Sequence, residues 1–118
     1  MKVLVVDDSK AMRMIVRRAL RQTGLDLDVS EAENGKAAFD QLVETRFDFV
    51  LSDWNMPEMN GYELLQRIKA ENIPVKLGFV TSESTDEMKS QAREAGAEFL
   101  ISKPFTPEVL SERLGRYA

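Results

Sequence analysis

Residues 47–57 decide the fold, and they read FDFVLSDWNMP. The apolar run Phe49–Leu51 has the composition of a strand that is buried on both faces, as strands of helix-covered parallel sheets are. The run ends in Asp53, and Pro57 and Gly61 interrupt the chain before the next helical pattern. Ligands of open α/β sheets bind at the carboxyl ends of the strands, which is where Asp53 stands. Aspartate also starts ordinary turns, so the rest of the chain has to decide between the two interpretations.

Outward from this run, short apolar segments alternate with helical patterns five times. The expected strands are residues 3–6, 28–32, 49–51, 75–80 and 99–101, with Gly78 interrupting the fourth. Asn34-Gly35 indicates a turn, and the expected helix caps are Ser9, Asn60, Ser84 with Glu87, and Thr106 with Pro107. Such alternation predicts a parallel sheet with helices on both faces, joined by right-handed crossovers. A length of 118 residues fits one domain over residues 1–118.

The composition narrows the chemistry. The chain contains neither cysteine nor histidine, so disulfides, thiolate catalysis and the commonest general base are excluded. A bound metal would have to be a hard cation held by oxygen atoms. The net charge of −4 argues against broad nucleic-acid binding. No segment has the apolar length that a membrane span requires, and residues 1–8 do not read as a signal peptide, so we expect a cytoplasmic protein.

Charged and hydroxyl side chains stand where four of the predicted strands end. They are Asp7-Asp8, Asp53, Thr81 and Lys103, and a parallel sheet brings them to one edge. Two carboxylates about 4 Å apart repel by about 4 kcal/mol at an effective dielectric constant of about 20. A bound cation, the Lys103 ammonium or a raised pKa could offset this repulsion. Because only oxygen ligands are present, Mg²⁺ is the best fit, and a carboxylate beside it could accept a phosphoryl group as an acyl phosphate.

Four segments carry a resemblance to a known family. They are Val6–Ser9, Asp53–Gly61, Val80–Ser82 and Lys103–Thr106. Together, in this order and at strand ends, they are highly specific, and the whole chain resembles the receiver domain of two-component response regulators, especially the free-standing chemotaxis type. The resemblance implies a flavodoxin-like (βα)5 fold with strand order 2-1-3-4-5.

The resemblance also implies a role for each site residue. Asp53 would be the phosphoacceptor, and Mg²⁺ would be bound by the carboxylates of Asp8 and Asp53, by the backbone carbonyl of Asn55 and, through water, by Asp7. Thr81 and Lys103 would bind the phosphoryl group and act as the switch. The side chains of Asn55 and Glu83 would tune the loss of the phosphate, and the Lys103–Pro104 bond would be cis.

One position departs from the family pattern. Receivers commonly carry Tyr or Phe three residues before the lysine, and that ring moves when the threonine is recruited; Leu100 stands there instead, next to Phe99. Side chains alternate along a strand, so Phe99 is expected on the opposite face and cannot substitute. The output is therefore expected to rely more on the loop after Thr81.

The implied function is a signalling switch without a turnover substrate. A histidine kinase or a histidine phosphotransfer domain would donate the phosphoryl group, and phosphorylation would change the affinity for a downstream protein, for which a flagellar motor switch protein is a candidate. Binding to nucleic acid or to a membrane is not expected.

Three alternatives stay open from the sequence. The chain could be a phosphorelay intermediate or a receiver cut from a longer regulator. It could be an aspartyl-phosphate phosphatase, but such enzymes resembling haloacid dehalogenases need a second Asp where Asn55 stands. It could carry a nucleotide or flavin on the same architecture, but the first strand is followed by Asp7-Asp8 and not by a glycine-rich loop.

The first helix has a basic face with two interpretations. Its apolar positions are Met12, Ile15, Val16, Ala19 and Leu20, and its opposite face carries Lys10, Arg13, Arg17 and Arg21. Such a face is most often just solvated. The sharper hypothesis is that Lys10, Arg13 and Arg17, which stand close to Asp7-Asp8, steer an acidic phosphodonor domain.

Overall fold

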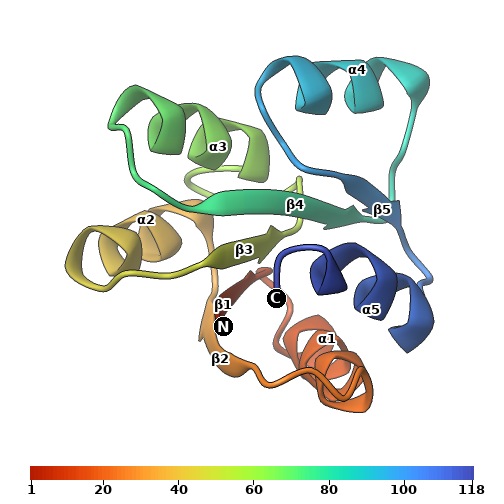
Figure 1. The fold of residues 1–118 in the computed structure, drawn as a ribbon. Helices are drawn as coiled ribbons and strands as arrows, with labels where there is room; N and C mark the ends of the chain where they lie inside the picture. Colours follow the sequence, from red (N-terminus) through yellow and green to blue (C-terminus); the bar gives the residue numbers. More distant parts are fainter.

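A central parallel sheet lies between two layers of helices in the computed structural model, which describes all 118 residues (Figure 1). The strands are β1 (Lys2–Val6), β2 (Asp28–Ala32), β3 (Phe49–Ser52), β4 (Lys76–Thr81) and β5 (Leu100–Ser102). The helices are α1 (Lys10–Gln22), α2 (Gly35–Glu44), α3 (Gly61–Ala70), α4 (Asp86–Glu94) and α5 (Pro107–Gly115). All neighbouring strands are parallel, in the order β2-β1-β3-β4-β5, which confirms the predicted fold class.

Each face of the sheet has its own core. Helices α1 and α5 cover one face, and α2, α3 and α4 cover the other (Figure 1). Alternate residues of a strand enter opposite cores: Phe49 and Leu51 face α1 and α5, whereas Val50 faces the other layer. The central strand β3 is buried throughout, because both of its faces are covered. Its carboxyl end, which leads to Asp53, is therefore held by packing on two sides.

Helix α4 is the most thinly packed of the five helices. Ala92 is its only fully buried residue. The helix begins one residue later than predicted: Thr85 is the N-cap and accepts a hydrogen bond from the Met88 amide, so the prediction of Ser84 as the cap was wrong. The Ser84 hydroxyl instead accepts a hydrogen bond of 2.6 Å from Ser102 at the end of β5, which leaves the capping position to its neighbour.

Three further expectations need correction. Asn34 is the N-cap of α2 and accepts a hydrogen bond of 2.8 Å from the Ala37 amide, so Asn34-Gly35 opens a helix directly. Gly78 does not interrupt β4: it pairs with Leu51, and a Cβ atom there would meet the Phe99 ring at 2.3 Å, so glycine makes room for that ring. Ile15 is half-exposed and not inward-facing, because α1 has the sheet and α5 on one side only.

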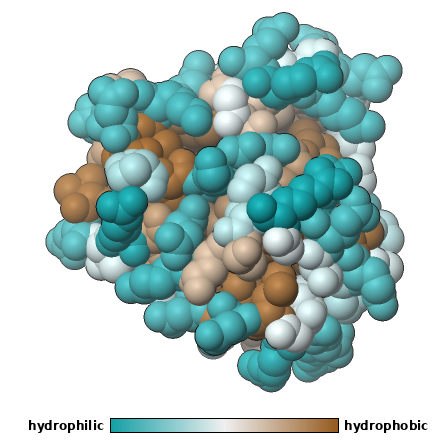
Figure 2. All heavy atoms as spheres, viewed as in Figure 1, coloured by the Kyte–Doolittle hydropathy of each residue, from teal (hydrophilic) through white to brown (hydrophobic).

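Hydrophilic side chains cover most of the face seen in Figure 2, and apolar surface shows only in patches between them. None of the five helices combines the length and the apolar character that a membrane crossing needs.

Candidate functional site

The carboxyl ends of β1, β3, β4 and β5 bring the predicted site residues together. Asp7 and Asp8 follow β1, Asp53 follows β3, Thr81 ends β4, and Lys103 comes directly after β5. Backbone hydrogen bonds tie these ends to one another: the Asp53 amide donates to the Val6 carbonyl at 2.9 Å, and the Lys103 amide donates to the Thr81 carbonyl at 2.8 Å. The ladder of the sheet therefore continues into the loops that carry the functional groups.

The Lys103 ammonium lies between two carboxylates. Its Nζ is 3.0 Å from Oδ2 of Asp7 and 3.7 Å from Oδ2 of Asp53. The three side chains are only 13%, 5% and 14% exposed for Lys103, Asp7 and Asp53. Charges removed from water in this way interact more strongly than surface pairs do. Lys103 thus offsets part of the repulsion between the carboxylates of Asp7 and Asp53. This was one of the three ways in which the sequence predicted that the repulsion could be offset.

Asp7 is the most firmly held member of the cluster. Its Oδ1 accepts a hydrogen bond of 2.9 Å from the Ser9 amide, and its Oδ2 accepts from Lys103. Its own amide donates to the carbonyl of Ala32 on β2. Asp8, in contrast, is exposed, and its carboxylate accepts no hydrogen bond within the chain. The two neighbouring acids therefore differ: one is fixed inside the site and the other is open to a ligand.

A hard cation fits this cluster. One carboxylate oxygen from each of Asp7, Asp8 and Asp53 lies within 4.8 Å of the others. Three carboxylates face a single ammonium, which leaves an excess of negative charge and a set of oxygen ligands that suits Mg²⁺. Asn55 lies two residues after Asp53 on the β3–α3 loop, with an exposed side chain, and its part as a carbonyl ligand stays a prediction.

Burial raises the pKa of the Asp53 carboxyl above its ordinary value of 3.8; the Lys103 ammonium lowers it, and the Asp7 carboxylate raises it again. The Trp54 amide also donates to Oδ1 of Asp53 at 2.7 Å, which favours the ionised form. Burial is the largest of these effects. Ionised Asp53 therefore costs the free protein stability, and a cation bound at this position would relieve that cost.

Asp53→Asn is accordingly expected to stabilise the protein in the absence of divalent cations. Because the pKa of Asp53 is raised on folding, wild-type stability falls as the pH rises from 3.8 through the folded-state pKa, and the asparagine variant escapes this loss. At neutral pH we therefore expect a higher unfolding midpoint for Asp53→Asn than for wild type. Thermal melts with a chelator at several pH values measure the difference.

The pH series carries its own check. Below pH 3.8 both proteins hold a neutral side chain at this position, so their midpoints should converge. Asp40→Asn on the exposed side of α2 is the matched control for loss of one acidic charge. A rise that is equally large in the Asp40 variant would mean that net charge, and not burial of Asp53, is responsible.

Thr81 is completely buried at the end of β4, and its Oγ1 accepts a hydrogen bond of 3.4 Å from the Glu83 amide. The Glu83 side chain is exposed.

Phe99 and Leu100 point to opposite faces of the sheet, as expected: Phe99 stacks on Phe49 with ring centroids 5.5 Å apart, and Leu100 packs against the core under α2–α4. Phe99 therefore cannot take the place of an aromatic ring at residue 100.

Trp54 belongs to a cluster of three aromatic rings. Its ring stacks on Tyr62 at 5.3 Å between centroids and contacts Phe79 at 4.7 Å. It is also partly exposed and directly follows Asp53. Trp54 is therefore a packing residue that also lies directly beside Asp53.

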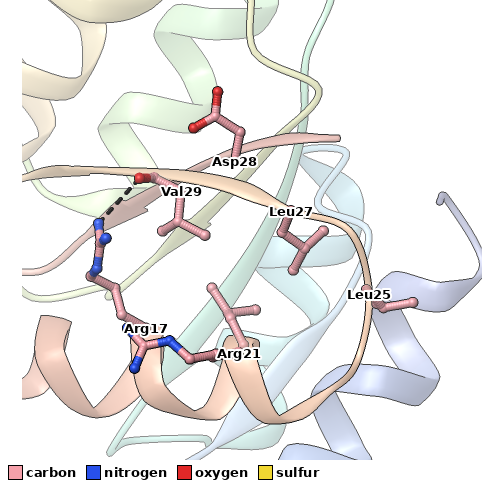
Figure 3. Close-up of a pocket in the computed structure, with 7 residues that line it drawn as sticks. Arg17, Arg21, Leu25, Leu27, Asp28 and Val29 are labelled. Atoms are coloured by element: carbon pink, nitrogen blue, oxygen red, sulfur yellow. Dashed lines mark hydrogen bonds between the residues drawn. The ribbon is translucent and has the colours of Figure 1, made fainter.

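The basic face of α1 is not simply solvated. Arg13 is only 14% exposed, and Arg13 and Arg17 both contact Glu31 on β2. Arg17 also donates to the Val29 carbonyl, beside a groove of about 350 Å³ between α1 and β2 that Arg21 helps to line (Figure 3). This pairing was missed from the sequence, although Glu31 stands in the strand that follows α1 and can therefore be a partner for an arginine of that helix.

Comparisons with known proteins agree with this geometry. A family model described as the response regulator receiver domain matches residues 3–115. A chemotaxis protein CheY homolog of Campylobacter jejuni is 44% identical over 97% of this chain and 89% of its own length. Chemotaxis protein CheY-3 of Vibrio cholerae is 41% identical over 98% of this chain and 90% of its own.

Solved structures show the same likeness. The chemotaxis protein CheY4 of Vibrio cholerae superimposes with a TM-score of 0.87 at 34% identity, covering 99% of this chain and 98% of that one. A receiver domain of a Francisella response regulator gives a TM-score of 0.89 at 27% identity, over 98% and 94% of the two chains. With residues 3–115 matched by the family model and curated relatives of 44% and 41% identity covering 97% and 98% of its length, this chain belongs to the family of response regulator receiver domains.

Proposed function

We propose that this chain is a phosphorylation-operated switch in which Asp53 accepts a phosphoryl group from the phosphohistidine of a histidine kinase or of a histidine phosphotransfer domain. The observation that carries the proposal is the placement of the Asp53 carboxylate, partly buried at the end of β3 with an ammonium at 3.7 Å and two further acids beside it. In the transfer, a P–O bond forms to the carboxylate, the P–N bond breaks, and the imidazole leaves.

Each neighbouring residue has a part in this proposal. Asp8, Asp53 and the Asn55 carbonyl would hold Mg²⁺, and Asp7 would contribute through water. When bound, the metal supplies positive charge for the phosphoryl oxygens. Lys103 already faces Asp53, so it binds a phosphoryl oxygen as a point charge once the group arrives.

The switch itself involves Thr81. Its hydroxyl is buried and accepts a hydrogen bond from the Glu83 amide. If this hydroxyl turned to contact a phosphoryl oxygen, the loop that carries Glu83 and leads to the thinly packed helix α4 would move with it. Phosphorylation thereby shifts an equilibrium between two conformations and alters the affinity for a downstream protein. The exposed side chains of Asn55 and Glu83 are the groups that we expect to tune the loss of the phosphate to water.

The biological setting is proposed from the relatives. The two curated relatives of 44% and 41% identity are chemotaxis proteins, which favours a cytoplasmic chemotaxis response regulator whose target is a flagellar motor switch protein. The chain catalyses its own phosphorylation and dephosphorylation and has no turnover substrate.

Incubation with acetyl phosphate tests the proposal without any knowledge of the cognate kinase. We expect intact-mass spectrometry to show a gain of one phosphoryl group in the presence of Mg²⁺ and none with a chelator. Asp48→Asn, outside the site at the opposite end of β3, should still be labelled. Labelling that is equally fast without Mg²⁺, or no labelling with it, would contradict the proposed switch.

A further inference from the structure

Arg13 reaches from α1 to the loop that carries the two metal-binding acids. Its Nη1 donates to the backbone carbonyl of Asp7 at 2.7 Å, and its Nε donates to Oε1 of Glu31 at 2.8 Å. The carbonyl of Asp7 belongs to the peptide group that joins Asp7 to Asp8. A guanidinium offers several donors in one rigid plane, so one side chain can hold both acceptors at once. Arg13 thus connects the acidic loop to β2.

Strand β2 holds the same loop from the other side. Glu31 pairs with Val5 in the sheet register, and the carbonyl of the next residue, Ala32, accepts from the Asp7 amide at 3.2 Å. The Asp7 amide is therefore tied to the β2 backbone, and its carbonyl is tied through Arg13 to a β2 side chain. This leaves little freedom of rotation in the peptide that leads into Asp8.

Asp8 is the residue whose orientation depends most on this arrangement. Its carboxylate is exposed and accepts no hydrogen bond within the chain, so nothing but its backbone sets the direction from which the side chain approaches the cluster. We propose that Arg13 is a positioning residue of the Mg²⁺ site, which aims the Asp8 carboxylate by holding the Asp7–Asp8 peptide. The proposal rests on the proposed function, because it takes Asp8 as a ligand of the metal.

Charge and positioning predict opposite effects when Arg13 is replaced. Arg13 is a cation near the metal site, so removing its charge should by itself strengthen Mg²⁺ binding. Loss of a residue that orients a metal ligand typically weakens binding by about 10- to 100-fold. A weaker affinity in Arg13→Gln therefore cannot be explained by electrostatics. Arg17→Gln is the matched control, because Arg17 also contacts Glu31 and carries the same charge but donates to the Val29 carbonyl, away from the acidic loop (Figure 3).

The test is a Mg²⁺ titration followed by the fluorescence of Trp54, the only tryptophan of the chain, which lies next to Asp53. Calorimetric titration at constant ionic strength gives an independent dissociation constant. We expect Arg13→Gln to bind Mg²⁺ about tenfold more weakly than wild type, and Arg13→Lys to bind more weakly as well, since an ammonium lacks the planar fork. Arg17→Gln should bind no more weakly than wild type.

A second variant checks the connection through Glu31. Glu31→Gln should weaken Mg²⁺ binding less than Arg13→Gln, and the double variant should be no weaker than Arg13→Gln alone, because both act through one contact chain. Thermal melts confirm that each variant is folded. Affinity in Arg13→Gln that equals or exceeds that of wild type would overturn the inference and leave the proposed switch intact. A wild-type protein without any saturable Mg²⁺ response would overturn the metal site itself, and this inference with it.

Discussion

Gly61→Ala is expected to lower the free energy of unfolding by about 3 kcal/mol, at the upper end of the usual cost of overpacking. Gly61 is the first residue of α3, and a Cβ atom there would lie 2.1 Å from the backbone carbonyl oxygen of Asp53 and 2.9 Å from the Phe79 ring. The carbonyl cannot rotate away like a side chain, because it lies in the connection from β3 to the site. Relief of the clash has to move either the start of α3 or the end of β3.

Urea unfolding of Gly61→Ala and of wild type measures this effect. The same displacement should weaken Mg²⁺ binding and acetyl phosphate labelling, because Asp53 is both a proposed metal ligand and the proposed phosphoacceptor. Gly115→Ala is the control: a Cβ atom at Gly115 meets nothing within 4 Å, so no loss of stability is expected there. If Gly61→Ala were as stable as Gly115→Ala, the close contact between α3 and the Asp53 carbonyl would not exist in solution.

Lys103→Met is expected to destabilise the protein by about 3 kcal/mol at neutral pH without divalent cations, because removing one partner of a buried ion pair leaves an uncompensated charge. The Asp7 side chain is 5% exposed and has the ammonium at 3.0 Å; Asp53 has it at 3.7 Å. Methionine keeps most of the length and apolar volume of the lysine stem. The loss therefore reports the charge and not the packing.

Mg²⁺ should narrow the difference between Lys103→Met and wild type, since a divalent cation at the three carboxylates supplies the missing positive charge. Denaturant titrations with and without Mg²⁺ measure this. Lys76→Met is the matched control, because Lys76 is 54% exposed and its contact with Glu98 is 3.6 Å long; such a pair contributes about 0.5 kcal/mol or less. Equal losses in the two variants, or a difference that Mg²⁺ does not change, would contradict the account of Lys103.

The convergence of Asp7, Asp53, Thr81 and Lys103 at one edge of the sheet could be predicted because it depends on local patterns, whereas the order of the strands followed only from the family resemblance. Each strand is a short apolar run, and a parallel sheet places the carboxyl end of every strand at the same edge, whatever the details of packing. Sequence position at a strand end was therefore enough to assemble the site before any distance was known. The N-cap Asn60 could be predicted for the same reason, because the groups that it caps lie within one turn of it.

Features that depend on a distant partner were missed. The contact of Arg13 with Glu31 joins residues on different elements, and nothing in the spacing of α1 separates a solvated arginine from a paired one. Gly78 is explained only by the ring of Phe99, which is brought over it by the pairing of β4 with β5. Ser84 and Thr85 are both good capping residues, and the choice between them is made by Ser102, a residue of another strand.

Mapping the phosphoryl group onto the chain tests the central claim most directly. Protein labelled by acetyl phosphate with Mg²⁺ can be reduced with borohydride, which converts a phosphorylated aspartate to homoserine and so marks it permanently for peptide sequencing by mass spectrometry. We predict that the mark appears at Asp53 alone and that Asp53→Asn, although folded, acquires none. A mark at Asp7 or Asp8 in the wild-type protein, or undiminished labelling of Asp53→Asn, would contradict the account.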